Sequence, residues 1–245
     1  MRPLRITGIV VLGAVLGAVL LLGMTACGSA ETPPQTGGSG LVSGGLPSAP
    51  STLPADLGRV EIRNYKGKPL TAVAAEPENS IHGPQYVDVA TYTLSIHDYV
   101  KSPVKLTYQQ VVSMPSVKKV VALSCVDGWS VTYLGQGVLL EDLLARAGGV
   151  KPGAKVVIFE CADGYETSLP LDYIRQHHIM LGYKMNGLTM PPERGFPFQV
   201  IAEDRWGYKW AKWVTGIDVN WNANYKGYWE FRGYDNQAVL PTTTP

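Results

Sequence analysis

The sequence predicts an α+β fold, in which a strand-rich mixed or antiparallel sheet and a few helices form a single domain. Short β-branched segments bounded by Pro or Gly outnumber segments with helical spacing. The two kinds do not alternate regularly, which argues against a doubly wound α/β fold. The chain has 245 residues, of which 45% are hydrophobic and 17% charged, a composition typical of a globular domain with a sizeable core.

The strands are predicted from apolar residues that alternate with polar ones or run together. Tyr92, Leu94 and Ile96 alternate with Thr and Ser, the period of a half-buried strand. Uninterrupted β-branched runs predict two buried strands, at 118–123 and 154–160. Three more strand-like segments follow near the C-terminus, at 179–187, 196–202 and 212–221.

Two segments have the spacing of helices. In 139–149 apolar residues recur every three or four positions, and the segment ends on Gly148 and Gly149, a C-terminal stop signal. A further turn of helix is expected within 169–177. The pair His177 and His178 is therefore expected at a helix end or on the surface.

The N-terminus has the features of an export signal. Arg2 and Arg5 precede an uncharged apolar run, 6–24, and "MTAC" at 24–27 resembles the bacterial lipobox, with Met24 where Leu is usual. Cys27 is the expected lipidation site, and 1–27 a lipoprotein signal peptide. An uncleaved membrane helix is the alternative. Either reading predicts an extracytoplasmic domain attached to the cell membrane, by a lipid anchor in the first case.

Low-complexity segments flank the expected domain. Residues 28–55 are rich in Gly, Ser and Pro and predict a flexible tether. The domain itself is expected at 56–238, and 239–245 reads as a disordered tail. The chain is almost neutral once Arg2 and Arg5 are set aside, and it lacks Lys or Arg runs, which excludes nucleic acid as the main partner.

Several standard sites are excluded by their spacing. "GQG" at 135–137 lacks the third glycine of a dinucleotide-binding loop. A zinc site from Cys125, Cys161, His177 and His178 would lack the close pairs of ligands that structural zinc sites have. No serine lies in a nucleophile-elbow pattern.

The two cysteines of the domain, Cys125 and Cys161, remain as candidates for a functional site. In an oxidising compartment a disulfide between Cys125 and Cys161 is the default expectation, although a domain of this size does not need one. A thiol redox protein using both is a weaker alternative, because they are far apart and form no Cys-x-x-Cys motif. Cys125 ends an apolar run and is followed by Asp127, Gly128 and Trp129, a position from which a soft metal ligand can face a cleft.

Five segments between Ser80 and Tyr234 resemble, in the same order, the sulfite oxidase-like molybdopterin-binding domain family. They are "IHGPQYVDVATYTLSIHDYVKSPVKLTYQQVV", "LSCVDGWS", "GVLLEDLLARAG", "ADGYETSLPL" and "YKMNGLTMPPERGFPFQVIAEDRWGYKWAKWVTGIDV". The resemblance implies the family's α+β fold and a molybdenum-molybdopterin cofactor. It implies a two-electron oxygen-atom transfer on a small-molecule substrate, with the hard chemistry carried by the cofactor.

The resemblance assigns roles to six residues. Cys125 matches the thiolate ligand of molybdenum, and Cys161 has no match and is expected to be a buried strand thiol. Contacts to the pterin are implied for Asp163, Arg194, Lys209 and Lys212, and a place near the metal for Tyr225, with Tyr228 as a competitor. From the residues alone, the two lysines also fit a solvated strand edge, Asp163 an ordinary turn, and the tyrosine a core position.

Departures from the family pattern bear on the substrate. Sulfite oxidases carry an arginine five residues after the ligand cysteine, where this chain has Ser130, and "SIHGPQ" replaces their upstream Arg-Asn-His. A pocket without those cations stabilises a dianion poorly. Trp129 indicates a less charged pocket, and the segment resembles the Cys, Val, acidic, small, Trp pattern of bacterial relatives that include a periplasmic reductase of oxidised methionine. Sulfite is therefore disfavoured, and the resemblance implies reduction of an S-oxide as an alternative.

The sequence contains no haem-attachment, flavin or iron–sulfur motif. An oxidoreductase of this kind would therefore exchange electrons with a partner, for which a cytochrome or a membrane quinone protein is expected. The alternative from another class is a binding or interaction module that has kept the fold and lost the cofactor.

Overall fold

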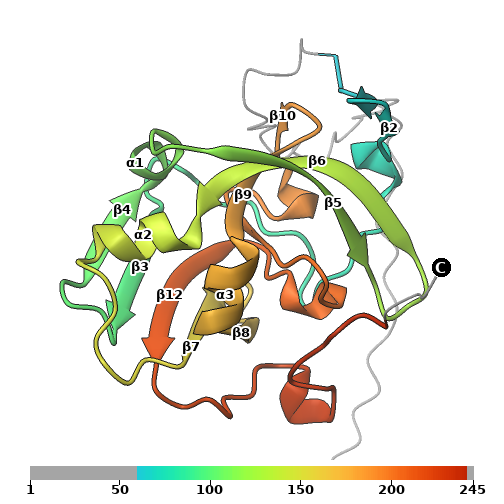
Figure 1. The fold of residues 1–245 in the computed structure, drawn as a ribbon. Coiled ribbons are helices and arrows are strands. Elements are labelled where there is room, and N and C mark those ends of the chain that lie inside the picture. The colour runs from blue at the N-terminus through green and yellow to red at the C-terminus, as the bar shows by residue number, and fades with distance from the viewer. Residues whose placement is uncertain (1–59, 242–245) are drawn as a thin grey trace, which may run out of the picture. The chain divides into compact units, whose positions relative to one another are not determined.

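Two five-stranded sheets form the framework of the protein, and a computed structural model describes residues 60–241 (Figure 1). In the first sheet, here the β9 sheet, the order is β10-β9-β6-β5, and β11 also pairs with β9. Its strands are β5 (Val117–Ser124), β6 (Ser130–Leu139), β9 (Met180–Met185), β10 (Leu188–Thr189) and β11 (Gln199–Ile201).

The second sheet, here the β12 sheet, has the order β4-β3-β12-β7-β8. Its strands are β3 (Thr93–Asp98), β4 (Val104–Thr107), β7 (Val156–Cys161), β8 (Glu166–Pro170) and β12 (Val214–Asn220). Strand β12 runs parallel to β3, and the other neighbours are antiparallel. The sheet is therefore mixed, as the sequence predicted.

Short helices and one hairpin complete the fold. The hairpin consists of β1 (Asn64–Tyr65) and β2 (Lys68–Pro69). The helices are α1 (Tyr108–Val112), α2 (Leu140–Arg146) and α3 (Leu171–His177), with 3-10 turns η1 (Val73–Ala75), η2 (Pro192–Arg194), η3 (Gly207–Lys209) and η4 (Glu230–Arg232). Among the described residues, no helix has the length and apolar character needed to cross a membrane.

Most predicted elements are confirmed. Tyr92, Leu94 and Ile96 are buried in and beside β3, and their polar neighbours face outward. Strand β7 is buried almost throughout, as expected for an apolar run. Helix α2 ends where predicted, because Gly148 and Gly149 adopt positive φ angles that other residues rarely take.

Two expectations about local structure were wrong, and one strand was missed. Strand β5 is not buried on both faces but alternates, because it lies at the edge of the β9 sheet. Strand β8 forms where a loop was expected. The ten-residue strand β6 was not predicted, because Gly135 and Gly137 break its apolar pattern.

Gly137 has a physical role in β6. A Cβ atom there would lie 2.2 Å from the backbone oxygen of Leu181 on β9, so only glycine lets the two strands approach this closely. Figure 1 shows β5 and β6 as a long curved hairpin, and the segment that follows β12 runs along the bottom of this view before it reaches the turn between β5 and β6.

The ends of the chain lie partly outside the described residues. The signal peptide, Cys27 and the tether at 28–55 belong to this part and stay predictions. At the other end Val239 bridges Arg205, and the Leu240 N–H donates to the Asp204 carbonyl. Regular contacts thus continue two residues into the segment expected to be a disordered tail.

Candidate functional site

A cavity of about 210 Å³ lies beside the turn between β5 and β6. This volume is below the roughly 300–1,000 Å³ of typical small-molecule sites, so a bound pterin would extend beyond it. Segments far apart in the sequence build its wall. Its lining residues include Glu76, Asn79, Ser80, Cys125, Asp127, Trp129, Asp163, Tyr165, Tyr208, Lys212, Trp229 and Tyr234.

Cys125 is held on the cavity wall by a tight turn. Its N–H donates to the Trp129 carbonyl at 2.9 Å, and its carbonyl accepts from the Gly128 N–H at 3.1 Å. Gly128 takes a φ of 88°, which the turn requires. The turn thus explains why the cysteine stands where the strand ends: it places a thiol that is only 7% exposed at the edge of a cavity.

The polar neighbours of this thiol are an amide and a carboxylate. Asn79 Nδ2 lies 3.5 Å from Cys125 Sγ and donates to Asp127 Oδ2 at 2.9 Å, while the thiol itself donates to Asp127 at 3.5 Å. Burial and the Asp127 carboxylate raise the pKa of the Cys125 thiol, although hydrogen bonds oppose them. Asn79 and Asp127 thus fix the position of the sulfur on the cavity wall.

Residues 73–81 form a strap along one side of the cavity, which the sequence analysis did not assign to the site. Arg194 fixes it: Nε donates to the Val73 carbonyl and Nη1 to the Pro77 carbonyl, each at 3.1 Å. Its Nη1 also lies 3.9 Å from the buried carboxylate of Glu76, whose pKa is raised by burial. Arg194 therefore holds the strap and does not itself line the cavity.

Cys125, Asp163 and Lys212 are the predicted site residues that line the cavity together. Asp163 lies in the turn between β7 and β8, where its Oδ1 accepts from the Tyr165 N–H at 3.0 Å. Lys212 Nζ lies 3.3 Å from both Glu78 Oε1 and the Glu193 carbonyl. The structure is compatible with both predicted contacts to a pterin.

Lys209 lies elsewhere, in the protein interior. Its side chain is 0% exposed and donates to Glu230 Oε1, to the Ser168 carbonyl at 3.1 Å and to Asn236 Oδ1 at 3.2 Å. All three ammonium hydrogens are therefore used within the protein. Lys209 thus attaches η3 to η4, and its contact with the pterin, which the resemblance implied, stays a prediction.

Tyr225 is also outside the cavity, where its hydroxyl donates to Glu166. The competitor, Tyr228, does not line it either. Tyr165, Tyr208 and Tyr234 do, and the Tyr234 ring packs against both Tyr208 and Trp229, with ring centroids 5.3 and 5.1 Å away. The rich aromatic content of 225–234 was the available signal, but only the fold tells which rings face inward.

The cavity is aromatic and acidic. Three carboxylates line it, from Glu76, Asp127 and Asp163, against one ammonium group, that of Lys212. Ser80 Oγ is buried with no hydrogen-bond partner among the described residues. An unsatisfied buried hydroxyl is costly, so it marks a place where a polar ligand group is expected. A soft thiol, an ammonium and a free hydroxyl in one cavity fit the metal, phosphate and ring amides of a molybdopterin.

Cys161 is not bonded to Cys125, since both are free thiols. The default expectation of a disulfide was therefore wrong, and Cys161 is the buried strand thiol, at the end of β7, that was expected for a cysteine without a match in the family. Burial and then the carboxylates of Asp163, Glu166 and Glu160 raise its pKa well above the usual value.

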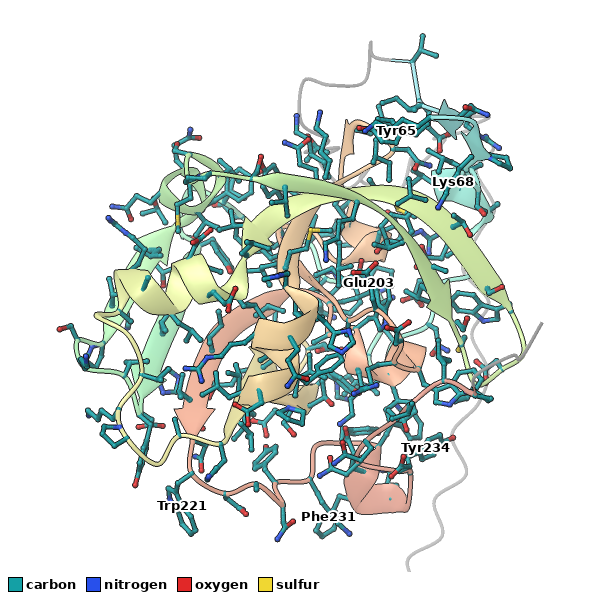
Figure 2. All side chains as sticks on the ribbon, viewed as in Figure 1. Tyr65, Lys68, Glu203, Trp221, Phe231 and Tyr234 are labelled. Atoms are coloured by element: carbon teal, nitrogen blue, oxygen red, sulfur yellow. The ribbon has the colours of Figure 1, made fainter. Side chains whose placement is uncertain are left out.

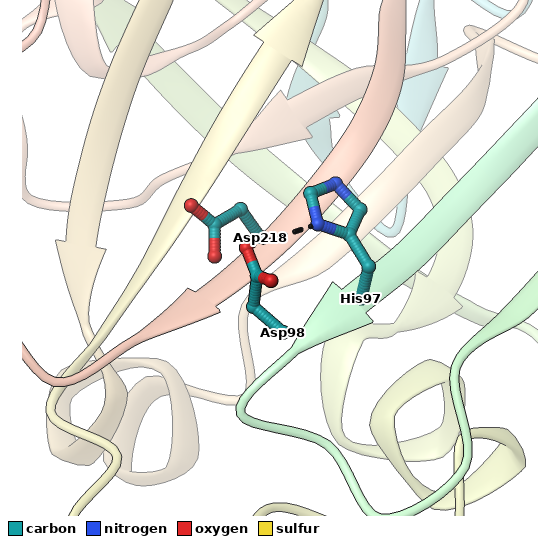
Figure 3. A group of neighbouring side chains, drawn as sticks. All are labelled: His97, Asp98 and Asp218. Atoms are coloured by element: carbon teal, nitrogen blue, oxygen red, sulfur yellow. Dashed lines mark hydrogen bonds and ion pairs between the residues drawn. The ribbon is translucent and has the colours of Figure 1, made fainter.

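Among the described residues, one group of side chains has the spacing of metal ligands, and it contains no cysteine: His97, Asp98 and Asp218 (Figure 3). His97 Nδ1 lies 3.2 Å from Asp98 Oδ2, and its Nε2 lies 3.3 Å from Glu160 Oε2. Both ring nitrogens thus already face carboxylates, which favour the imidazolium over a metal-binding imidazole. His177 and His178 lie at the end of α3, as expected.

Comparison with known proteins identifies the family. Residues 82–229 match the model of the oxidoreductase molybdopterin binding domain. The uncharacterized oxidoreductase YuiH of Bacillus subtilis is 34% identical over 152 residues, which cover 62% of this chain and 76% of YuiH. The putative protein-methionine-sulfoxide reductase subunit YedZ1 of Azospira oryzae is 32% identical over 65% of this chain and 61% of its own length.

More distant relatives agree. Mitochondrial sulfite oxidase of Rattus norvegicus is 30% identical over 57% of this chain, which spans only 28% of that protein. The crystal structure of the sulfane dehydrogenase SoxCD from Paracoccus pantotrophus shares the fold, with a TM-score of 0.55 and 24% identity over 58% of this chain and 41% of that chain. The chain belongs to the molybdopterin-binding oxidoreductases of the sulfite oxidase-like family, and its cofactor is molybdopterin.

Proposed function

We propose that the protein is a lipid-anchored, extracytoplasmic reductase that removes the oxygen atom from a neutral S-oxide. The reaction consumes two electrons and two protons and releases a thioether and water. The bound cofactor supplies the two-electron oxygen-atom transfer. The residues of this chain would hold the cofactor and select the substrate.

One observation carries the choice of substrate: the cavity beside Cys125 has three carboxylates and one ammonium group, and Glu78 already pairs with that ammonium. Because Lys212 is also assigned to the pterin phosphate, no lysine or arginine among the lining residues is left to stabilise a sulfite dianion. A neutral sulfoxide has no charge to stabilise, and its alkyl groups can pack on Trp129, Trp229 and Tyr234. The similarity to the putative protein-methionine-sulfoxide reductase subunit YedZ1 supports the same class of substrate.

Within the site, Cys125 is assigned to the metal and Lys212 to the phosphate of the pterin. Asp163 would accept a hydrogen bond from a polar atom of the cofactor, and Ser80 would donate one to another. Asn79 and Asp127 fix the orientation of the thiol. Electrons would come from a cytochrome or membrane quinone protein.

The test uses the purified, cofactor-loaded chain. With a reduced viologen dye as electron donor, it should reduce methionine sulfoxide, and with ferricyanide as acceptor it should oxidise sulfite at least about 100-fold less efficiently. Trp129→Ala should raise the KM for the sulfoxide by about five-fold or more, the contribution of one aromatic contact. Efficient oxidation of sulfite would contradict the proposal.

The alternatives are separated by two further results. Cys161→Ser should keep full activity, whereas a thiol redox protein using both cysteines would lose it. A chain without molybdenum or pterin, purified from cells that make the cofactor, would instead be the cofactor-free binding module that the sequence left open.

A further inference from the structure

The hairpin of β1 and β2 exposes two lysines beside an aromatic ring. Lys66 and Lys68 are both exposed, and neither pairs with a carboxylate among the described residues. Lys66 Nζ lies 5.5 Å from the centre of the Tyr65 ring. Figure 2 shows Tyr65 and Lys68 together at this hairpin, far in this view from the exposed Trp221 and Phe231.

The hairpin is held firmly on the β9 sheet. Asn186 is fully buried, and its carbonyl accepts from the Ile62 N–H at 2.9 Å. Its side chain donates to Glu61 and to the Thr71 carbonyl, both at 2.8 Å. The Thr71 N–H donates to the Thr132 carbonyl on β6 at 2.7 Å. The hairpin that carries the two lysines is therefore attached to the β9 sheet on both of its flanks.

An open groove of about 370 Å³ separates the hairpin from β5. A third lysine, Lys119, lines it together with Glu203, and the two form an ion pair of 2.9 Å. Lys119 Nζ also donates to the His177 carbonyl at 3.0 Å. The charges of Lys119 and Glu203 cancel. The net charge of the groove is therefore positive and comes from Lys66 and Lys68.

We propose that this face, the hairpin with Lys66 and Lys68, lies against anionic lipid headgroups and orients the domain on the membrane. The inference rests on the proposed membrane anchor. The hairpin is the first described element after the apolar run and the Gly, Ser and Pro-rich segment, so along the chain it lies nearest to the proposed anchor. Lysines match lipid phosphates in charge, and an adjacent tyrosine suits the interface.

The expected strength fits an orienting contact. Each lysine near an anionic membrane surface favours the bound state by a factor of roughly five, so two give roughly 30-fold. That is too weak to hold a soluble domain at a membrane, where two signals are needed. It is sufficient to bias the orientation of a domain that an anchor already keeps close.

The experiment is lysine footprinting of the full-length chain in vesicles. The protein, purified from bacterial membranes, is reconstituted into phosphatidylglycerol or phosphatidylcholine vesicles and treated with a membrane-impermeant amine reagent, and labelling is read by peptide mass spectrometry. Lys66 and Lys68 should react at least about five-fold more slowly in phosphatidylglycerol. Lys101 and Lys105, exposed at the hairpin between β3 and β4, are the internal control and should not change.

Three further arms decide the interpretation. In 0.5 M salt the protection should disappear, because the Debye length falls to a few ångströms. Protection in detergent by inorganic phosphate alone would mean a small-anion site and would overturn the membrane proposal. Equal labelling in the two kinds of vesicle would overturn it as well.

Flotation of the vesicles separates this inference from the anchor. A chain that does not float with lipid contradicts the anchor, and the orientation falls with it. A chain that floats but shows no protection contradicts the orientation alone. As a second readout, Lys66→Gln/Lys68→Gln should make Tyr65 accessible to aqueous quenchers or oxidants in phosphatidylglycerol, whereas Lys101→Gln/Lys105→Gln should leave it shielded.

Discussion

Replacing Lys209 by methionine should destabilise the domain strongly. The Lys209 and Glu230 side chains are both 0% exposed, and the carboxylate would lose its counter-charge. Glu230 Oε1 would keep only the Thr167 hydroxyl, at 2.6 Å, and Oε2 already has no hydrogen-bond partner among the described residues. Removing one partner of a buried ion pair costs about 3–5 kcal/mol.

The assay is thermal and urea unfolding of the purified chain, followed by circular dichroism. For a domain of this size, 3–5 kcal/mol corresponds to a fall in Tm of roughly 6–20 °C. Lys209→Met/Glu230→Leu should recover most of the loss, because an apolar pair of similar volume replaces a buried ion pair at little cost.

Lys212→Met is the matched control, because this lysine lies in the same sequence motif but lines the cavity. It should cost less stability than Lys209→Met, because the Lys212 side chain and its partner Glu78 are 13% and 33% exposed, and it should instead lower the retention of pterin. The reasoning is refuted if Lys209→Met unfolds like the wild type and loses the pterin, since Lys209 would then contact the cofactor as the resemblance implied.

Two further predictions concern the sheets. Gly137→Ala should lower the free energy of unfolding by about 2 kcal/mol or more in urea titrations, because its Cβ would overlap the Leu181 oxygen; a loss below 0.5 kcal/mol would contradict this close approach. Burial opposes protonation of His97, but contacts with Glu160 and then Asp98 outweigh it and raise its pKa. Protonated His97 therefore stabilises the fold. This stabilisation is complete below the unfolded pKa of about 6.5 and is lost as the pH rises through the higher pKa of the folded state. Unfolding measured from pH 5.5 to 8.5 should therefore show a decline in stability that His97→Gln reduces, and equal slopes would contradict the assignment.

The strands of the core could be predicted because their apolar pattern is local. Alternation around Leu94 and Ile96 and the run in β7 fix which faces are buried, whatever the rest of the chain does. Strand β6 could not be predicted, because its glycines serve a contact with β9 that lies outside any sequence window.

The residues of the site also differ in whether the sequence alone could identify them. Cys125 could be identified because a thiol at the end of an apolar run, within a resembling segment, has few other uses. Lys209 and Lys212 have the same local sequence character, and only the packing of η3 against η4 turns one inward to Glu230 and leaves the other on the cavity. Asn79 and Ser80 carry no local signal, because the long-range contacts of Arg194 bring their strap to the cavity.

The most direct test of the central assignment is the molybdenum and pterin content of the exported chain, wild type beside Cys125→Ser. Elemental mass spectrometry and the fluorescence of the oxidised pterin would give both quantities. The structure predicts about one molybdenum and one pterin per chain in the wild type, and in the variant a loss of molybdenum that exceeds the loss of pterin. Equal molybdenum retention with an unchanged metal spectrum in the variant would contradict the role of Cys125 as the ligand.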